Sequence, residues 1–258
     1  MSKKDDINKL YDKSAFINRI NGILFFANVA LSLILLSNVE ELNKAITILQ
    51  IVLSVVFAIL LLINECWLWY DAESARRKGN IQNGFNINLQ QLHTEGYYNN
   101  SISPSLLKYA VNTFESNFFS KEIAIRMLPK KIITCLISII AFIISLRYVE
   151  NNELLLIISQ IIFSSYFISD TIILISYTIR IKYWYEKAYD QLITNGIKYR
   201  DQLKWLLYYI VEYECVKAYF KVNLDSNLFK KYNNALSEEW NNIKKEVSYY
   251  EDASHILL

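Results

Sequence analysis

Glycine, proline and histidine are all scarce in this sequence. The 258 residues include five glycines, two prolines and two histidines. A chain with so few turn-forming residues does not build a β-sandwich or a propeller, because those folds need a turn every few residues. Two histidines also leave little material for a metal centre or for histidine-based catalysis. The scarcity favours long helices and argues against most classes of enzyme.

Cysteine is rare as well, and motifs that carry chemistry are missing. The three cysteines, Cys66, Cys135 and Cys215, are odd in number and lack paired spacing, which is typical of reduced thiols. Phosphate-loop, dinucleotide-binding, zinc-protease, CxxC and nucleophile-elbow patterns do not occur. We interpret acidic pairs near the C-terminus, such as Glu212 and Glu214, as solvated charge. We therefore expect no enzymatic activity, no metal site and no cofactor.

Apolar residues dominate instead. The chain is 53% hydrophobic and only 20% charged. A helix needs about 20 residues to cross the hydrocarbon core of a bilayer. Four apolar runs come close to this length or exceed it, and they cover residues 20–37, 45–63, 132–149 and 154–179. We expect an all-α membrane protein with four transmembrane helices in two hairpins and with cytosolic helical regions.

The four runs divide the chain into regions. We expect an N-terminal tail and first hairpin, a cytosolic central segment, a second hairpin and a cytosolic helical tail, over residues 1–70, 71–130, 131–181 and 182–258. In the tail, the pattern predicts helices over residues 183–192, 198–222 and 226–250.

The central segment carries the turn signals. Glycines and asparagines without a clear period predict turns and loop over residues 79–100. Ser103 can cap a helix that begins with Pro104, and Pro129 is expected to end this helix before the third run.

Basic residues flank the four runs on one side only. They cluster before the first run, after the second, before the third and after the fourth, whereas the two short connecting loops are acidic. Loops rich in lysine and arginine stay in the cytosol. The charge pattern therefore predicts that both termini and the central segment are cytosolic.

Polar side chains fall on single faces of the expected spans. At 100° per residue, Ser159, Tyr166 and Tyr177 of the fourth run lie within about 40° of Asp170. An ionised side chain in lipid costs on the order of 3 kcal/mol, so it normally faces water or a partner. The fourth run contains no lysine or arginine that could neutralise Asp170. This favours a water-filled pore between subunits, which the carboxylate would face. The expected pore-lining residues are Asp170, Tyr166, Ser159, Tyr177, Glu65, Ser54 and Gln50.

A second interpretation of these polar faces, called polar stripes below, stays open. Serine, threonine, asparagine and glutamine side chains also hydrogen-bond between packed transmembrane helices. In that case the stripes hold the bundle together and line no pore. Glu65 lies near the cytosolic end of the second run, where a carboxylate can also reach the interface.

A candidate ligand site follows the second run. Cations bind phosphates, tyrosines stack on bases and asparagines bind base edges. The residues that combine these properties are Arg76, Arg77, Tyr97, Tyr98, Asn99 and Asn100. The alternatives are that the arginines only set the topology and that the tyrosines only pack a turn.

These elements together resemble a known family. The order is two spans, the pair Arg76-Arg77, the run Ile81-Gln82-Asn83-Gly84-Phe85, the run Tyr97-Tyr98-Asn99-Asn100, two further spans and a helical tail. This layout resembles the SMODS-associated four-transmembrane effectors over nearly the whole chain. The family usually has acidic residues after its arginine pair, where this chain has Gly79 and Gln82.

The resemblance implies a function. Family members are regarded as pore-forming effectors of bacterial anti-phage defence, encoded beside nucleotidyltransferases whose oligonucleotide product controls them. It implies a homo-oligomeric channel, assumed here to be a tetramer, in the bacterial inner membrane. A cyclic or linear oligonucleotide would open this channel or hold it closed, and the open channel would depolarise the membrane. The alternative is a non-channel integral-membrane scaffold or toxin-like protein.

Overall fold

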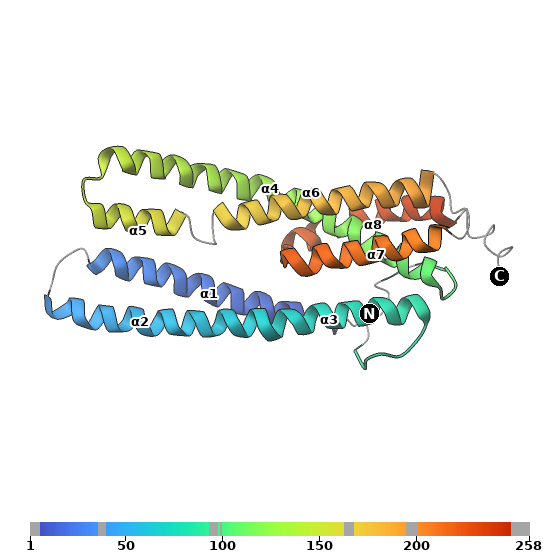
Figure 1. Cartoon of the computed structure of the whole chain (residues 1–258), viewed down its shortest axis with the longest axis horizontal. Helices are drawn as coiled ribbons and strands as arrows, with labels where there is room; N and C mark the ends of the chain where they lie inside the picture. The colour runs from blue at the N-terminus through green and yellow to red at the C-terminus, as the bar shows by residue number, and fades with distance from the viewer. Residues whose placement is uncertain are drawn as a thin grey trace. The chain divides into compact units, whose positions relative to one another are not determined.

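The molecule is built of helices. The computed structural model describes residues 6–35, 40–92, 98, 100–162, 168–194 and 201–248, and every regular element in these ranges is helical (Figure 1). In chain order the elements are α1 (Asn8–Leu35), α2 (Glu40–Ile63), the π-helix η1 (Asn64–Leu68), α3 (Trp69–Phe85), α4 (Leu106–Tyr148), α5 (Asn152–Ile162), α6 (Asp170–Tyr189), the π-helix η3 (Asp190–Thr194), α7 (Asp201–Phe220) and α8 (Ser226–Ser248). The expected all-α fold is confirmed for these residues.

Three helical stretches are long and apolar enough to cross a membrane. They are Asn8–Leu35, Asn43–Phe85 and Leu106–Tyr148, and they cover residues 20–35, 45–63 and 132–148 of the first three expected spans. The fourth expected span, residues 154–179, is described only in two pieces, so it is not confirmed as one helix. It includes α5, which is too short to cross by itself, and the first turns of α6, while residues 163–167 lie outside the described ranges.

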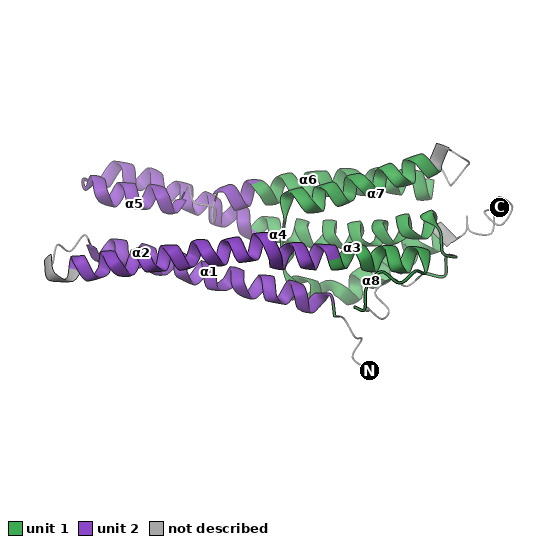
Figure 2. Ribbon diagram, turned by 60° about the horizontal axis from the view of Figure 1, so that its bottom comes forward, with its two compact units in different colours: residues 1–6, 75–129, 173–258 green, residues 7–74, 130–172 purple. Residues whose placement is uncertain are grey.

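The chain divides into two compact units (Figure 2). Unit 1 comprises Met1–Asp6, Ala75–Pro129 and Ile173–Leu258, and unit 2 comprises Ile7–Ser74 and Lys130–Ile172. The helices α4 and α6 each contribute residues to both units.

Unit 2 holds the apolar helices. Its helix α1 packs along α2 and also contacts η1 and α5. Many large aliphatic side chains of this unit are exposed, a pattern that is compatible with helices in a membrane. In α2 they include Ile48, Leu49, Ile51, Val52, Val55, Val56 and Ile59. In α4 they include Ile132, Ile133, Leu136, Ile137, Ile140, Ile143 and Ile144.

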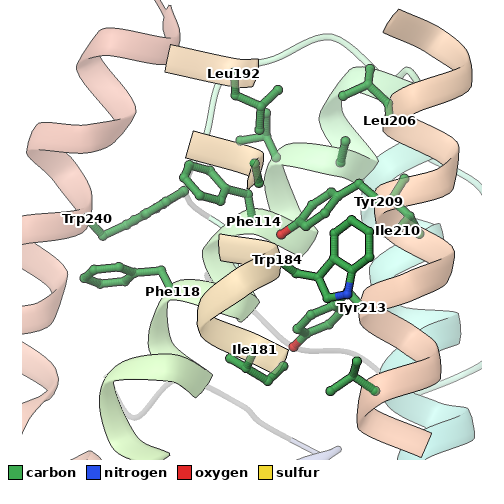
Figure 3. Packing of buried hydrophobic residues seen from close by; sticks show 14 of the residues in the cluster. Phe114, Phe118, Ile181, Trp184, Leu192, Leu206, Tyr209, Ile210, Tyr213 and Trp240 are labelled. Atoms are coloured by element: carbon green, nitrogen blue, oxygen red, sulfur yellow. The ribbon is translucent and has the colours of Figure 1, made fainter. Parts of the chain in front are cut away.

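Unit 1 has an aromatic core (Figure 3). The ring of Phe114 in α4 stacks on Tyr185 of α6 at 5.2 Å and meets Trp240 of α8 edge-on at 5.4 Å. Tyr209 and Tyr213 of α7 are buried beside them. Burying one large apolar side chain stabilises a fold by about 1.5–3 kcal/mol. The region 203–220, which is apolar enough to resemble a fifth span, is thus explained by its packing in this core.

The helices of the C-terminal part lie where the pattern predicts them. They are α6 with η3, α7 and α8. Asp225 caps α8, since its Oδ1 accepts hydrogen bonds from the backbone N–H groups of Asn227 and Leu228 at 2.8 and 3.2 Å.

The prediction of turns over residues 79–100 is wrong in its first part. Helix α3 continues to Phe85. Gly84 lies inside this helix, at a position that has no room for a side chain. A Cβ atom there would lie 2.8 Å from Cβ of Tyr109 in α4. Asn86, with φ of 54°, follows in the left-handed conformation that commonly ends a helix.

The predicted helix boundaries of the central segment also need correction. The helix begins at Leu106, after Ser105, whose Oγ accepts a hydrogen bond from the Lys108 N–H at 3.2 Å. Pro129 does not end it, because α4 runs on to Tyr148 with the proline inside. A proline removes one backbone donor at a cost of about 3 kcal/mol. Apolar packing of unit 1 before it and a long apolar helix after it outweigh that loss.

Candidate pore face and candidate ligand site

A groove with a mainly apolar surface and several polar side chains runs between α1 and α2 in unit 2. Its volume is about 620 Å³, and it is lined by Phe25, Asn28, Ser32, Thr47, Gln50, Ile51, Ser54, Val55, Phe57 and Ala58. Two of the predicted pore residues, Gln50 and Ser54, belong to this lining. The groove is where the polar stripes of the first two spans meet.

Gln50 connects the two helices. Its Nε2 donates to the carbonyl oxygen of Asn28 at 3.1 Å and to Oγ of Ser32 at 2.7 Å. Such contacts between membrane helices contribute about 0.6 kcal/mol on average. Gln50 therefore has a packing role, whereas Ser54 is exposed along the groove.

Polar contacts continue at the end of this helix pair. Nδ2 of Asn64 donates to Oδ1 of Asn18 at 2.9 Å. The next residue, Glu65, is half-buried in the π-helix η1. Beyond it, the Tyr11 hydroxyl donates to Oε1 of Glu73 at 2.7 Å. π-Helical turns are rare and often lie at functional sites, so Glu65 keeps its place among the candidates.

Asp170 has a partner that the sequence argument missed. Its carboxylate forms an ion pair with the ammonium of Lys131 in α4. The expectation that no lysine or arginine neutralises Asp170 is therefore wrong: Lys131 lies one residue before the third apolar run, and its side chain reaches the first turn of α6. The two side chains stay 42% and 38% exposed, so a paired, accessible charge lies beside the apolar part of α4.

Of the other residues predicted from the fourth span, Ser159 belongs to unit 2 and Tyr177 to unit 1. Ser159 is half-buried in α5, and its hydroxyl bonds to the carbonyl oxygen of Leu156 at 2.7 Å. Tyr177 is fully buried in the core of unit 1, with its ring 6.2 Å from that of Phe220. Because a buried ring cannot face a lumen, Tyr177 does not belong to the pore face. Tyr166 lies outside the described residues.

The two arginines of the candidate ligand site both bind one carboxylate. Arg76 contacts both oxygens of Glu214 in α7, with Nη1 at 3.0 Å from Oε1. Nε of Arg77 lies 2.9 Å from Oε2 of the same residue. The guanidinium of Arg76 also lies 5.8 Å from the centroid of the Tyr213 ring. The interpretation of Glu214 as solvated charge is therefore wrong, since its side chain is only 15% exposed.

The described part of the Tyr-Tyr-Asn-Asn run packs on α4. The Tyr98 hydroxyl lies 3.3 Å from Oγ of Ser116. Nδ2 of Asn100 donates to Oδ1 of Asn112 at 2.8 Å, and Nδ2 of Asn112 donates to Asn83 of α3 at 2.9 Å. Tyr97 and Asn99 lie outside the described residues.

Tyr109 of α4 is electrostatically coupled to the arginine pair and to Glu214. Its ring meets Phe85 of α3 at 5.7 Å. Burial and the charge of Glu214 raise the pKa of Tyr109 to about 12, although Arg76 and Arg77 act in the opposite direction. Within unit 1, Tyr98 and Asn100 thus contact the N-terminal half of α4, whereas Arg76 and Arg77 contact α7 and act on Tyr109 of α4 through their charge.

The sequence did not reveal which residues of distant helices contact the candidate site residues. Glu214, Asn112 and Lys131 each act through a contact with a distant helix. A single sequence carries no signal for which helices pack together, so no spacing could have identified these pairs.

Metal binding and family relationships add no further site. Within the described ranges, no group of three or more histidine, cysteine, aspartate or glutamate side chains could hold a metal ion. Comparison with protein-family models, with curated proteins and with solved structures finds no match.

Proposed function

We propose that the chain is a homo-oligomeric channel of the bacterial inner membrane that acts in anti-phage defence and is gated by an oligonucleotide second messenger. Its four spans would be α1, α2, the second half of α4 and the segment 154–179, arranged as two hairpins with both termini in the cytosol. The basic residues that flank these segments support this orientation. The four-transmembrane effectors that the chain resembles provide the biological setting.

The observation that carries the channel proposal is the pair of accessible charges beside apolar helices. Asp170 and Lys131 remain more than a third exposed, although α4 presents aliphatic side chains from Ile132 onward. Charges at the edge of a hydrocarbon layer normally face a water-filled space or another protein chain. Several copies of the chain, arranged around a lumen, would turn this pair into a charged ring that influences ion selectivity.

A specific observation also favours the second candidate, a non-channel scaffold. The hydrogen bonds from Gln50 to Asn28 and Ser32 use polar groups of the stripes for packing within one chain. If all polar groups of the stripes served this purpose, the bundle would need no lumen.

The ligand site of the proposed channel would be in unit 1. An oligonucleotide carries phosphates and flat bases, so Arg76, Arg77, Tyr98 and Asn100 are suitable groups. All four now contact α4 or α7. A ligand phosphate would compete with Glu214 for the two arginines. Its binding would replace the Arg76–Glu214 and Arg77–Glu214 contacts with contacts between the arginines and the phosphate. Binding of this kind shifts a conformational equilibrium, because the ligand favours the state in which the arginines are released.

Ion flux across a vesicle membrane tests the proposal. The full chain is reconstituted into liposomes loaded with a potassium-sensitive dye, and the product of the neighbouring nucleotidyltransferase is added outside and inside. A channel gives a flux that changes when the nucleotide is added, in either direction. Vesicles that stay tight with and without nucleotide support the scaffold instead.

A further inference from the structure

Lys217 is a charged residue in an unusual position. It is 7% exposed, on the face of α7 that packs into unit 1. Among the described residues, its ammonium forms neither an ion pair nor a hydrogen bond. Burial of a lysine without a counter-ion is strongly unfavourable, so this position would be stabilised by an anion.

A second cation lies beside the same aromatic pair. Nζ of Lys217 is 5.9 Å from the centroid of the Tyr177 ring, and the guanidinium of Arg180 is 6.0 Å from the Phe220 ring. The two rings are 6.2 Å apart. Tyr177 and Arg180 are three residues apart on α6, as are Lys217 and Phe220 on α7, so each pair shares one helical face. The two cations therefore approach one pair of rings from opposite helices.

The neighbouring acid cannot neutralise them. Glu214 lies one turn before Lys217 on α7, but its two oxygens are bound by Arg76 and Arg77. Arg180 is exposed and, in the described part of the chain, has no carboxylate partner. Two cations without an acidic partner among the described residues thus lie beside one pair of rings, and Lys217 is mostly buried whereas Arg180 is exposed.

We propose that Lys217 and Arg180 form a phosphate-binding site on the α6–α7 face of unit 1. The planar guanidinium of Arg180 can hold two phosphate oxygens, and the ammonium of Lys217 supplies a point charge behind them. An anionic phospholipid headgroup and a free phosphate share this chemistry. We favour the lipid as the source, because the fourth expected span ends at residue 179, next to Arg180. The site is separate from the arginine pair of the proposed nucleotide site and does not depend on channel activity.

Thermal unfolding of the full chain in nanodiscs tests this site. Three conditions are compared at equal ionic strength: phosphatidylcholine alone, phosphatidylcholine with phosphatidylglycerol, and phosphatidylcholine with inorganic phosphate in place of chloride. We expect the wild-type Tm to rise with phosphatidylglycerol. Lys217→Met and Arg180→Gln should each weaken the apparent affinity for the anionic component about tenfold, the effect of losing one charged hydrogen bond. Lys182→Gln is the matched control, because Lys182 is an exposed cation of α6 that pairs with Glu186 at 3.7 Å.

The outcomes separate the two sources. A rise with phosphatidylglycerol alone identifies a lipid phosphate, and a rise with inorganic phosphate as well identifies a site for free phosphates. Lys217→Met should also be at least as stable as the wild type in phosphatidylcholine, because it removes an uncompensated charge and keeps the packing volume. The proposal is overturned if the wild-type Tm is equal in all three conditions, or if either variant keeps the full rise.

Discussion

Glu214 links α7 to α3 through ion pairs with Arg76 and Arg77. Its carboxylate binds both Arg76 and Arg77 and is mostly shielded from water. Removing one member of a shielded ion pair leaves the other charge without a partner, which costs roughly 3 kcal/mol. The residue thus stabilises unit 1 while it occupies the groups that we propose for ligand phosphates.

Glu214→Gln should lower the stability of the protein by about 3 kcal/mol, because the amide cannot neutralise the two guanidinium groups. Glu212→Gln is the matched control on the same helix, since Glu212 forms no ion pair among the described residues. Thermal unfolding in nanodiscs measures both variants. Equal Tm values for the two would show that the Glu214 ion pair does not stabilise the fold.

Tyr109 makes stability sensitive to alkaline pH. Burial, with the Glu214 charge, raises its pKa to about 12 in the folded chain, whereas an unfolded tyrosine has a pKa of about 10. Between these values the unfolded state loses the proton first, so this contribution to stability is complete below pH 10 and is lost as the pH rises toward 12. Tyr109→Phe should therefore show a smaller fall in Tm from pH 9.5 to 11.5, in the window set by the two pKa values. The same slope in both proteins would contradict this.

At the scale of helices, the close contact between α3 and α4 depends on Gly84. An alanine there would bring its Cβ 2.8 Å from Cβ and 3.0 Å from Cα of Tyr109. We expect Gly84→Ala to destabilise unit 1 by about 1–3 kcal/mol, even though alanine favours a helix by about 1 kcal/mol.

Gly22 in α1 provides the control, because nothing lies within 4 Å of an added Cβ. Gly22→Ala should gain up to about 1 kcal/mol from helix propensity. Thermal unfolding compares the two variants under the same conditions. If Gly84→Ala proved as stable as Gly22→Ala, the contact between α3 and α4 would not be as close as the structure has it.

The groove between α1 and α2 is the second feature at this scale. If it faces water in the assembled channel, Ser54→Cys should react with a charged, membrane-impermeant thiol reagent in intact vesicles. Ile48→Cys is the control on α2, since Ile48 is exposed but is not part of the groove. Both are made in a chain whose native cysteines are replaced by alanine. Slow labelling of both positions would indicate that lipid or packed helices fill the groove.

For the whole molecule, hydrophobic pattern and charge predicted the helices far better than their contacts. Apolar runs with few charges are long enough to be recognised individually, and the C-terminal helices followed from their polar boundaries. The continuation of α4 through Pro129 was missed, because packing on both sides outweighs a local helix breaker. The burial of Tyr177 was missed for a similar reason: its helical face suited a pore, but α7 covers it.

The candidate sites show the same limit. The arginines and the described residues Tyr98 and Asn100 all belong to unit 1, but the arginines contact α7 and the other two contact α4. Their partners Glu214 and Asn112, and the Lys131 partner of Asp170, come from distant helices. Pairing of this kind depends on tertiary packing, which a pattern in one chain does not encode.

Single-channel recording in planar bilayers tests the channel proposal most directly, with the two members of one ion pair as opposite probes. Asp170→Asn leaves the positive charge of Lys131, and Lys131→Met leaves the negative charge of Asp170. If the pair lines the conduction path, the reversal potential in a potassium chloride gradient should move toward the anion value in Asp170→Asn and toward the cation value in Lys131→Met, relative to the wild type. Recordings without channel openings in the wild type, or reversal potentials that neither substitution shifts, would contradict the account.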